Sequence, residues 1–527
     1  MADSPWWQGA ALYQLYVRSW HDSDGDGYGD IRGILERLDY LSWLGIDGVW
    51  LSPTMPSPDE DWGYDVSDYT SVHPELGTLA DLDALIAAGT ERGIRVLLDL
   101  VPNHTSSAHP WFVDARTARD SAHRDYYVWA DPAPDGGPPN NWLDATGQPA
   151  WQWEPATGQY YLHNFLAGQP DLNWWEPAVH AEFRRILDFW FDRGVAGFRI
   201  DVAHGLYKDA ELRDNPPLQA NHGELDGRYG LQPVYNANRP QTHDIYRDWR
   251  QIAGSYAPPR LLLGETWVPD AGRLASYYGS NDELQLAFNF PFAFAEFSEA
   301  GLRDVISKTL SALPSGACPV WMASNHDIGR FPSRWCAEDK PRIRLALLLL
   351  LTLPGTTVLY YGDEIGMADV LVLPDLQRDA MTKGAAGKRG NRDRARTPMR
   401  WDGSASAGFT AAGVVPWLPL PDVSEPDVAE QRGDTSSTLW FCKQLIDLRH
   451  TELGGGVADF ELLPGPAGLL AYRVGDIVVG LNLSAEQQRM PTGAGRQLLA
   501  TTGAASADPA ALGPSHGKIA RWLPALG

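Results

Sequence analysis

The chain has 527 residues, which is long for one compact core, so we expect two or three structural units or a decorated barrel. Its 44% hydrophobic and 21% charged residues are typical of a globular protein. The formal net charge of −24 and the isoelectric point near 4.9 argue against nucleic acid or an anionic membrane as a partner and favour a neutral ligand.

Eight strand-like apolar runs are spread along most of the chain. They cover residues 11–17, 48–53, 95–101, 197–202, 261–266, 283–290, 319–324 and 356–362. Segments with helical periodicity, such as 30–45 and 176–194, lie between them. This alternation builds a parallel sheet, and eight units are enough to close it, so we predict an α/β fold with a (β/α)8 TIM barrel.

Two connections are too long for ordinary loops of such a barrel. Residues 104–173 follow the third strand and are rich in Pro, Gly, Asn and Trp, which predicts an inserted subdomain, and residues 203–240 form a second polar insertion. The arginine-rich stretch 367–400 is expected to be a loop over the barrel mouth. The predicted barrel therefore comprises 1–103 and 174–453, with subdomain 104–173 inserted and a C-terminal antiparallel β domain at 454–527.

Three cysteines, Cys318, Cys336 and Cys442, show neither disulfide-like nor zinc-like spacing, which indicates reduced thiols. The first residues include no basic segment followed by a cleavable apolar stretch, and the run 345–353 is far shorter than the ~20 residues of a membrane helix. We expect a cytoplasmic protein without membrane contact. Nothing in the sequence indicates the oligomeric state.

Four short motifs each close or follow a strand-like run: DLVPNH (99–104), GFRIDVAH (197–204), LLLGETW (261–267) and ASNHDIGR (323–330). A carboxylate just past a barrel strand points toward the carboxyl-terminal rim, where barrel active sites lie. Asp201, Glu265 and Asp327 should therefore converge on one pocket. The alternative is that such residues only cap helices or pair with surface arginines. This explanation is common for a single motif, but it is less common when four such motifs follow one another in order.

Two of these carboxyl groups suit glycoside hydrolysis with retention, which uses a nucleophile and a proton donor about 5–5.5 Å apart. Asp201 follows Arg199 by two residues on one strand, so the cation is expected to keep Asp201 ionised. Glu265 precedes an aromatic residue in GETW, and a shielded pocket there would leave it a proton to donate.

On these motifs, and on LYQLYVRSW (12–20) and PGTTVLYYGDEIG (354–366), the chain resembles the alpha-amylase family of glycoside hydrolases over nearly its whole length. The resemblance implies that Asp201 is the nucleophile, Glu265 the acid and base, and Asp327 the transition-state stabiliser. It also implies glucose-binding roles for His104, Arg199 and His326, and a place for Asp99 beneath Arg199.

Three further segments, DWGYDVSDY (61–69), QPDLNW (169–174) and RARTPMRW (394–401), resemble the exo-acting alpha-glucosidase and oligo-1,6-glucosidase branch. This implies a pocket in which Tyr64 stacks on the terminal glucose and Phe165 forms a wall. Asp61 and Arg396 would pair and bind the distal hydroxyls, excluding an extended chain. The alternatives are turn geometry at 61–65 and a surface salt bridge at Arg396.

The segment DSDGDGYGD (22–30) alternates carboxylates with glycines, as calcium loops do, but lacks the distant glutamate of an EF-hand. The same loop in the resembling branch holds one metal ion. This implies one structural Ca²⁺ or Mg²⁺ bound by Asp22, Asp24, Asp26, the Tyr28 carbonyl and Asp30. An acidic turn without metal is the alternative. No cofactor is expected for catalysis.

Linkage specificity stays open. In the resembling branch a valine after the nucleophile, here Val202, accompanies activity on alpha-1,6 bonds, whereas the following AHGLYKD looks closer to alpha-1,4-glucosidases. We predict a retaining exo-acting alpha-glucosidase for short alpha-glucosides such as maltose, with transglucosylation. The alternatives are an oligo-1,6-glucosidase and a maltose or sucrose isomerase-type glucosyl transferase. An endo-acting amylase and a non-enzymatic binding protein are disfavoured by the predicted pocket and the three retained carboxylates.

Overall fold

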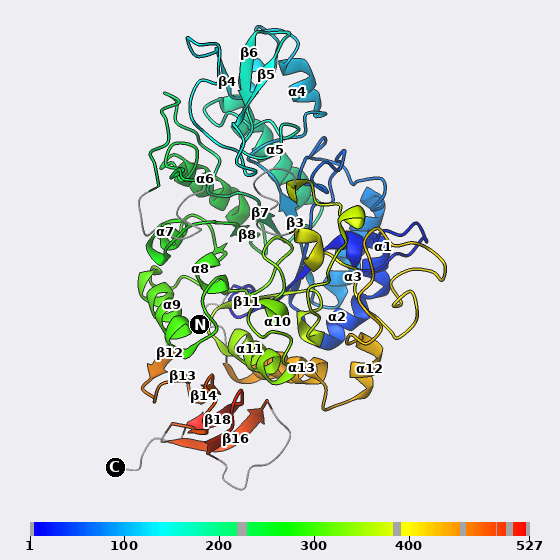
Figure 1. Ribbon diagram of the computed structural model, residues 1–527, viewed down its shortest axis with the longest axis vertical. Helices are drawn as coiled ribbons and strands as arrows, with labels where there is room; N and C mark the ends of the chain where they lie inside the picture. Colours follow the sequence, from blue (N-terminus) through cyan, green and yellow to red (C-terminus); the bar gives the residue numbers. More distant parts are fainter. Residues whose placement is uncertain are drawn as a thin grey trace.

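The computed structural model describes residues 5–218, 229–382, 391–453, 460–491, 493–501 and 510–522. Its centre is a nearly closed barrel of eight strands, in the order β10-β11-β1-β2-β3-β7-β8-β9, with every neighbouring pair parallel (Figure 1). The strands are β1 (Ala11–Leu15), β2 (Gly48–Leu51), β3 (Arg95–Leu100), β7 (Gly197–Ile200), β8 (Leu261–Gly264), β9 (Leu286–Ala287), β10 (Val320–Trp321) and β11 (Thr356–Tyr360). Each lies within a predicted run, so the barrel prediction is confirmed.

Helices surround the barrel. They are α1 (Ile31–Glu36), α2 (Leu38–Leu44), α3 (Leu79–Glu91), α5 (Pro177–Asp192), α6 (Thr242–Ser255), α7 (Ala271–Ser276), α8 (Phe290–Ala293), α9 (Glu299–Ala312), α10 (Phe331–Arg334), α11 (Lys340–Thr352), α12 (Val428–Gly433) and α13 (Thr438–Leu448). The single helix expected over 30–45 is broken at Arg37, whose φ of −104° and ψ of 5° leave the helical region between α1 and α2. The start of α1 is set by Asp30, whose carboxylate accepts the Gly33 N–H at 2.7 Å.

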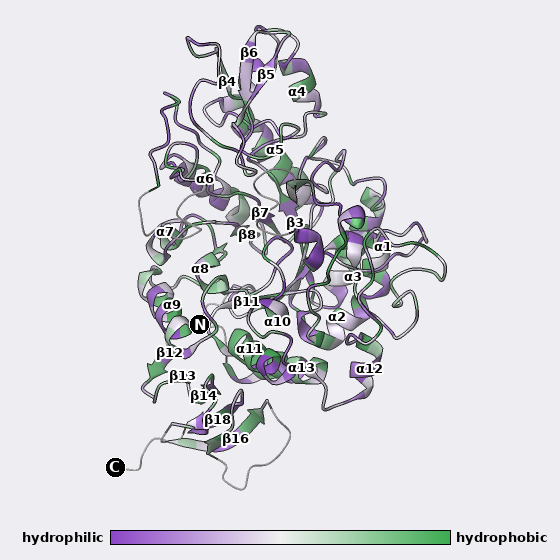
Figure 2. Cartoon of the chain, viewed as in Figure 1, coloured by the Kyte–Doolittle hydropathy of each residue, from purple (hydrophilic) through white to green (hydrophobic). Residues whose placement is uncertain are grey.

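Helix α11 contains the apolar run noted in the sequence. Leu345 and Leu347–Leu351 are completely buried, and Figure 2 shows this helix as hydrophobic. The helix is buried on all sides because it lies between the barrel and the C-terminal sheet, where Thr352 Oγ1 meets Tyr472 Oη at 2.6 Å. Within the described residues no helix is both long and apolar enough to cross a membrane.

The insertion after β3 contains helix α4 (Pro110–Ala115) and an antiparallel sheet in the order β4-β6-β5, at the top of Figure 1. Its strands are β4 (Trp129–Ala130), β5 (Trp151–Glu154) and β6 (Gln159–Leu162). The second insertion packs on this unit, because Trp142 Nε1 donates to Arg213 O at 2.8 Å and Tyr229 Oη donates to Ala145 O at 2.9 Å. Residues 219–228 of that insertion lie outside the described residues.

Short turns of 3-10 or π-helix also occur. One, η2 (Arg124–Tyr126), lies in the insertion after β3. The others are η1 (Val17–Ser19), η3 (Asp363–Ile365), η4 (Pro374–Leu376), η5 (Ala380–Thr382), η7 (Arg392–Ala395) and the π-helix η8 (Arg449–Leu453). Stretch 367–400 is irregular as expected, apart from η4, η5 and η7. Its residues 383–390 are not described.

The C-terminal unit is an antiparallel sheet in the order β12-β13-β14-β18-β16, beside a pair formed by β15 and β17. Its strands are β12 (Phe460–Leu463), β13 (Leu469–Val474), β14 (Ile477–Asn482), β15 (Gln488–Arg489), β16 (Ala494–Ala500), β17 (Ala511–Leu512) and β18 (Gly517–Trp522). It lies at the opposite end from the β4–β6 unit (Figure 1) and contacts the barrel through Arg303 Nη1, which donates to Leu463 O at 3.1 Å. The predicted boundary at residue 454 falls in an undescribed stretch, and the domain boundaries remain predictions.

A buried acid lies beneath the barrel wall in η3. Glu364 is completely buried, and its Oε1 accepts hydrogen bonds from Tyr13 Oη at 2.8 Å and from Tyr40 Oη at 2.7 Å. Burial raises the pKa of Glu364, and the two tyrosine hydrogen bonds only partly oppose this. The folded chain therefore favours the neutral acid.

We predict that Glu364→Gln makes the stability of the folded protein less sensitive to rising pH. A raised folded-state pKa contributes stability that is present below the unfolded pKa and is lost as pH rises through the folded value. The midpoint of thermal unfolding of the variant, relative to the natural chain, should therefore increase from pH 5 to pH 8. Glu430→Gln, at an exposed position of α12, is the matched control, and a difference that does not change with pH would contradict the prediction.

Candidate active site

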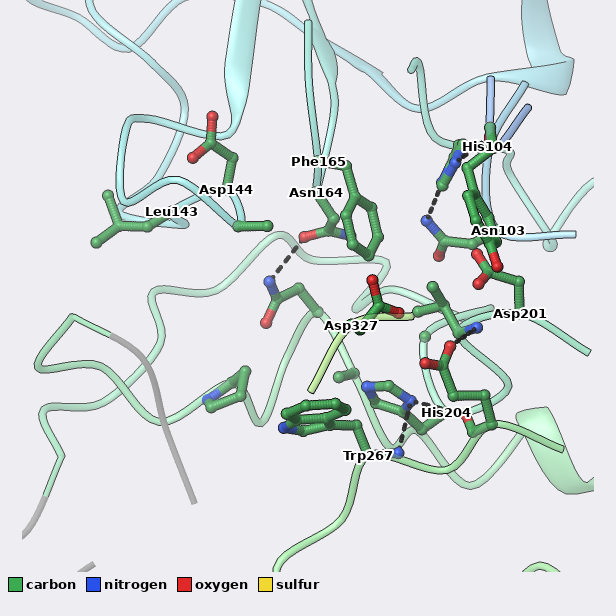
Figure 3. Close-up of a pocket in the computed structure, with 18 of the residues that line it drawn as sticks. Asn103, His104, Leu143, Asp144, Asn164, Phe165, Asp201, His204, Trp267 and Asp327 are labelled. Atoms are coloured by element: carbon green, nitrogen blue, oxygen red, sulfur yellow. Dashed lines mark hydrogen bonds between the residues drawn. The ribbon is translucent and has the colours of Figure 1, made fainter. Parts of the chain in front are cut away.

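Three predicted carboxylates lie at the carboxyl ends of barrel strands. Asp201 directly follows β7 and Glu265 directly follows β8, and their N–H groups extend the sheet by donating to Leu100 O and Ile200 O, each at 2.8 Å. Asp327 lies in the loop after β10. All three line one cavity of about 320 Å³, together with four other predicted residues, Asp61, Tyr64, His104 and Phe165. In Figure 3, Phe165 and Trp267 lie on opposite sides of the space that Asp327 enters.

Arg199 connects the carboxylates from below. Its Nη1 donates to Asp99 Oδ1 at 2.9 Å and to Asp201 Oδ1 at 2.7 Å, and its Nη2 lies 3.0 Å from Glu265 Oε1. The guanidinium is completely buried and lies 4.9 Å from the ring centre of Trp50, which also donates to Asp99. Asp99 thus lies behind Arg199 and does not line the cavity, as the sequence indicated.

Burial dominates the electrostatics of this cluster. Burial raises the pKa of Asp201 well above its usual range, Arg199 opposes this change, and the carboxylates of Glu265 and Asp99 add to it. Burial likewise raises the pKa of Asp99 to about 7, although Arg199 lowers it. The expected effect of Arg199 is present, because it lowers the pKa of Asp201, but burial outweighs it and the net direction is upward.

Asp327 has the opposite environment. Arg392 Nη1 and Arg396 Nη2 donate to its Oδ1 at 2.9 and 3.1 Å, and His326 Nε2 lies 3.3 Å from Oδ2. Burial raises the pKa of Asp327, but His326 and the two arginines outweigh it, so the net direction is downward. Burial also lowers the pKa of His326, so its imidazole is neutral and carries no positive charge. The low pKa of Asp327 is therefore due to the two arginines. Asp327 is therefore ionised at neutral pH.

The predicted ion pair between Asp61 and Arg396 is wrong. Asp61 Oδ1 instead accepts from Arg392 Nη2 at 2.7 Å, and the same nitrogen lies 2.7 Å from Asp379 Oδ1. Arg396 is completely buried behind the cavity, where its Nε donates to His326 O at 3.0 Å. Sequence reasoning identified the arginine-rich segment but chose the residue four positions too late, and it missed Asp379.

The remaining predicted residues form the floor and one side of the site. Tyr64 Oη lies 2.6 Å from His326 Nε2, and their rings stack with an interplanar angle of 3°. His104 Nε2 contacts Tyr64 O at 3.0 Å, and burial lowers the pKa of His104. Phe165 packs against His104 with ring centres 5.1 Å apart. Arg199, His326 and Arg396 do not line the cavity but contact it through Asp201 and Asp327.

The opposite wall comes from segments in which the sequence did not indicate individual site residues. Asn236 Nδ2 donates to Asn164 Oδ1 at 2.9 Å and thereby joins the second insertion to the β4–β6 unit across the cavity rim (Figure 3). His204 and Trp267 line the side next to Glu265. Trp267 follows Glu265 by two residues in GETW, so its position in the sequence could have indicated that it lies at the site.

A buried cation ties these segments to the barrel. Lys208 Nζ contacts Asp171 Oδ2 at 2.7 Å and Asn103 Oδ1 at 2.8 Å, and its side chain is only 3% exposed. Asp171 Oδ2 also accepts from Asn164 Nδ2 at 2.7 Å. The wall of the cavity is therefore anchored through a fully paired internal charge.

The acidic loop 22–30 lies apart from the cavity. Asp22, Asp24 and Asp30 bring one carboxylate oxygen each within 4.8 Å of the others, whereas the Asp26 carboxylate is not in that group. The N–H of Gly27 donates to Asp22 Oδ2 at 2.8 Å, and at its φ of +95° a Cβ would lie 2.4 Å from the Val415 carbonyl oxygen, so only glycine fits. A convergent set of hard oxygen donors fits Ca²⁺ or Mg²⁺.

Comparisons with known proteins agree with this geometry. The sequence model described as "Alpha amylase, catalytic domain" matches residues 14–454. A probable alpha-glucosidase of Rhizobium meliloti (strain 1021) is 39% identical over 485 residues, which cover 89% of this chain and 87% of that protein. An oligo-1,6-glucosidase of Heyndrickxia coagulans is 37% identical over 484 residues, covering 85% of each chain.

Two solved structures are similar along almost the entire chain. The alpha-glucosyl transfer enzyme XgtA superposes with a TM-score of 0.92 at 36% identity and covers 98% of this chain and 100% of its own. The trehalulose synthase MutB from Pseudomonas mesoacidophila MX-45 superposes with a TM-score of 0.89 at 32% identity, covering 98% of this chain and 99% of its own.

We predict that Arg392→Ala destabilises the fold strongly, because it leaves Asp61, Asp327 and Asp379 buried without their shared cation. Breaking such a pair costs about 3–5 kcal/mol, which should lower the thermal unfolding midpoint by several degrees. The matched control is Arg394→Ala, whose side chain is 43% exposed and pairs with Asp369 at 3.2 Å, and which should cost less than about 1 kcal/mol. Equal shifts in the two variants would contradict a central role for Arg392.

Proposed function

Because this chain belongs to the alpha-amylase family and is a glycoside hydrolase, we propose that it is a retaining, exo-acting alpha-glucosidase that removes glucose from the non-reducing end of short alpha-glucosides. The observation that carries the exo-acting part is the ionic network of Asp61, Arg392 and Asp379. It closes the cavity on the side of Asp327 with buried charged groups. A terminal sugar can hydrogen-bond these groups, whereas an internal sugar would leave them unpaired.

The proposed chemistry follows the two-step course of retaining enzymes. The Asp201 carboxylate attacks the anomeric carbon while Glu265 protonates the departing glycosidic oxygen, which gives a covalent glucosyl-enzyme. Glu265 then takes a proton from water, whose oxygen displaces Asp201 and releases alpha-glucose. Asp201 and Glu265 contact the same guanidinium, which holds both carboxyl groups at the place where one attacks and the other donates.

The other predicted residues would hold the sugar. Asp327, kept ionised by its arginines, would accept hydrogen bonds from ring hydroxyls and stabilise the positive charge of the oxocarbenium-like transition state. Tyr64 would stack on the glucose, Phe165 would wall the pocket, and His104, which lines the cavity beside Phe165, would contact the sugar. Arg199, His326 and Arg396 would act mainly through the carboxylates they contact.

Two alternatives keep specific support. Relatives include oligo-1,6-glucosidases, and Val202 follows the nucleophile as in alpha-1,6-cleaving members of the resembling branch. The superposition on a trehalulose synthase and on a glucosyl transfer enzyme favours transfer to a sugar or alcohol, since any acceptor that reaches the glucosyl-enzyme can replace water. The second insertion lines this acceptor side with Leu231, Gln232 and Pro233.

The decisive experiment is a time course on maltose, isomaltose, sucrose and trehalose, each offered alone, with glucose resolved from new oligosaccharides. We expect free glucose mainly from maltose, and a loss on the order of 10⁴-fold or more in Asp201→Ala. Glucose mainly from isomaltose would instead establish the alpha-1,6 reading, and new saccharides with little glucose would establish transfer or isomerisation. Inactivity on all four would refute the exo-glucosidase proposal.

We also propose one structural Ca²⁺ or Mg²⁺ in the loop 22–30, bound by Asp22, Asp24 and Asp30 and completed by Asp26 and the Tyr28 carbonyl. The ion would hold the loop and take no part in the chemistry. An intracellular location is supported by three unpaired, buried cysteines.

We predict that a chelator lowers the thermal unfolding midpoint of the natural chain and that added Ca²⁺ or Mg²⁺ restores it. An ion at 100-fold excess over its dissociation constant contributes about 2.7 kcal/mol. Asp24→Asn should abolish this dependence, whereas Asp304→Asn, at an exposed position of α9, should retain it. Identical midpoints with and without chelator in the natural chain would refute the metal proposal.

A further inference from the structure

Val202 has a strained backbone. Its φ is +44°, in the left-handed region that β-branched residues avoid because their side chains clash with the backbone there. Eleven non-glycine residues of the described chain have positive φ, and Val202 is the β-branched one among them. Such strain persists only where the surroundings enforce it, commonly at functional sites.

This conformation directs the backbone of residues 202 and 203 at Glu265. The Val202 N–H donates to Glu265 Oε2 at 3.0 Å, and the Ala203 N–H donates to the Glu265 main-chain oxygen at 3.0 Å. On the other carboxyl oxygen, Arg199 Nη2 lies 3.0 Å from Oε1. The Glu265 carboxyl group is therefore held at both oxygens, by a side chain on one and by a strained peptide on the other.

The Val202 side chain is held in place by packing against Gly205. A Cβ added to Gly205 would lie 2.7 Å from Val202 Cγ1 and 3.1 Å from Asn103 Oδ1, so Val202 packs directly against the glycine backbone. The turn is closed by the Gly205 N–H, which donates to Val202 O at 2.8 Å. Behind it, Asn103 is fixed by Lys208 Nζ at 2.8 Å. Val202 Cγ1 thus forms a wedge against the backbone of Gly205, which itself borders Asn103 of the buried lysine network.

We propose that Val202, wedged against Gly205, is a positioning residue for the acid and base step: its left-handed backbone fixes the plane of the Glu265 carboxyl group through the N–H to Oε2 contact. The inference rests on the proposed function only in assigning Glu265 as acid and base. Proton donation needs the carboxyl within hydrogen-bond reach of the leaving oxygen, and a misplacement of about 1 Å can cost about 100-fold in rate.

The test displaces the wedge without altering a carboxylate. Gly205→Ala places a methyl group against Val202 Cγ1, and the matched control Gly254→Ala adds a methyl group on α6 where a Cβ meets nothing within 4 Å. We expect kcat/KM on maltose to fall about 10- to 100-fold in Gly205→Ala. On 4-nitrophenyl alpha-glucoside, whose leaving group needs no protonation, kcat/KM should fall less than about threefold.

The second half of the reaction gives an independent readout on the same aryl substrate. Glu265 must act as base to release glucose, so kcat of Gly205→Ala should fall although its kcat/KM is nearly unchanged. Azide attacks the glucosyl-enzyme without a base. Added azide should therefore restore kcat several-fold and yield glucosyl azide. Val202→Gly, which removes the wedge and the strain together, should show the same pattern with an unfolding midpoint no lower than that of the natural chain.

The proposal is overturned if Gly205→Ala is as active as Gly254→Ala, or if both substrates lose kcat/KM equally and azide restores nothing, because a general structural defect would act in that way. Failure of the proposed function looks different. In that case the natural chain itself would release no glucose from maltose, while the kcat pattern and azide rescue on the aryl glucoside would still report on Val202.

Discussion

The buried guanidinium of Arg199 is the interaction on which the site depends. Three adjacent strands, β3, β7 and β8, supply Asp99, Asp201 and Glu265, and all three carboxyl groups meet this one cation. Without it, three buried acids would face one another in a medium of low dielectric constant, and each would have to take up a proton. With it, the three carboxyl groups are held together around one cation, which lowers the pKa values of Asp99 and Asp201, although burial still outweighs that effect.

The chain has a net charge of −24, so acidic residues outnumber basic ones. The two ends of the cavity contain different numbers of arginines close to their carboxylates. Asp327 contacts two arginines, Arg392 and Arg396, and its pKa falls, whereas Asp201 shares one arginine with two other acids and its pKa rises. One cavity therefore contains one aspartate whose pKa falls and another whose pKa rises: burial raises both values, and the number of nearby cations decides whether burial is outweighed.

Rigidity comes from elements outside the barrel strands. Lys208, paired internally with Asp171 and Asn103, fixes the second insertion against the β4–β6 unit, and the Asn164–Asn236 contact closes the rim between them. The same network borders Gly205, against which Val202 packs. Hydrogen-bond donors and acceptors that are already oriented cost no reorganisation when charge develops on a substrate, so this scaffold contributes to the chemistry without touching the reacting atoms.

Local pattern was sufficient for the barrel and for the three carboxylates, because strand periodicity depends on burial of alternating or continuous apolar side chains, and a residue just past a parallel strand must reach the carboxyl-terminal rim. It was not sufficient for the partner of Asp61. Arg392 and Arg396 lie four residues apart in an irregular segment, where no periodicity decides which side chain points inward, and only the packing of that loop over the mouth selected Arg392. The direction of the Asp201 pKa shift was likewise decided by tertiary structure, since it depends on burial and on a cation shared with Asp99 and Glu265 from other strands. The positive φ of Val202 is not visible in the sequence either, because it belongs to a backbone whose N–H contacts Glu265, 63 residues away.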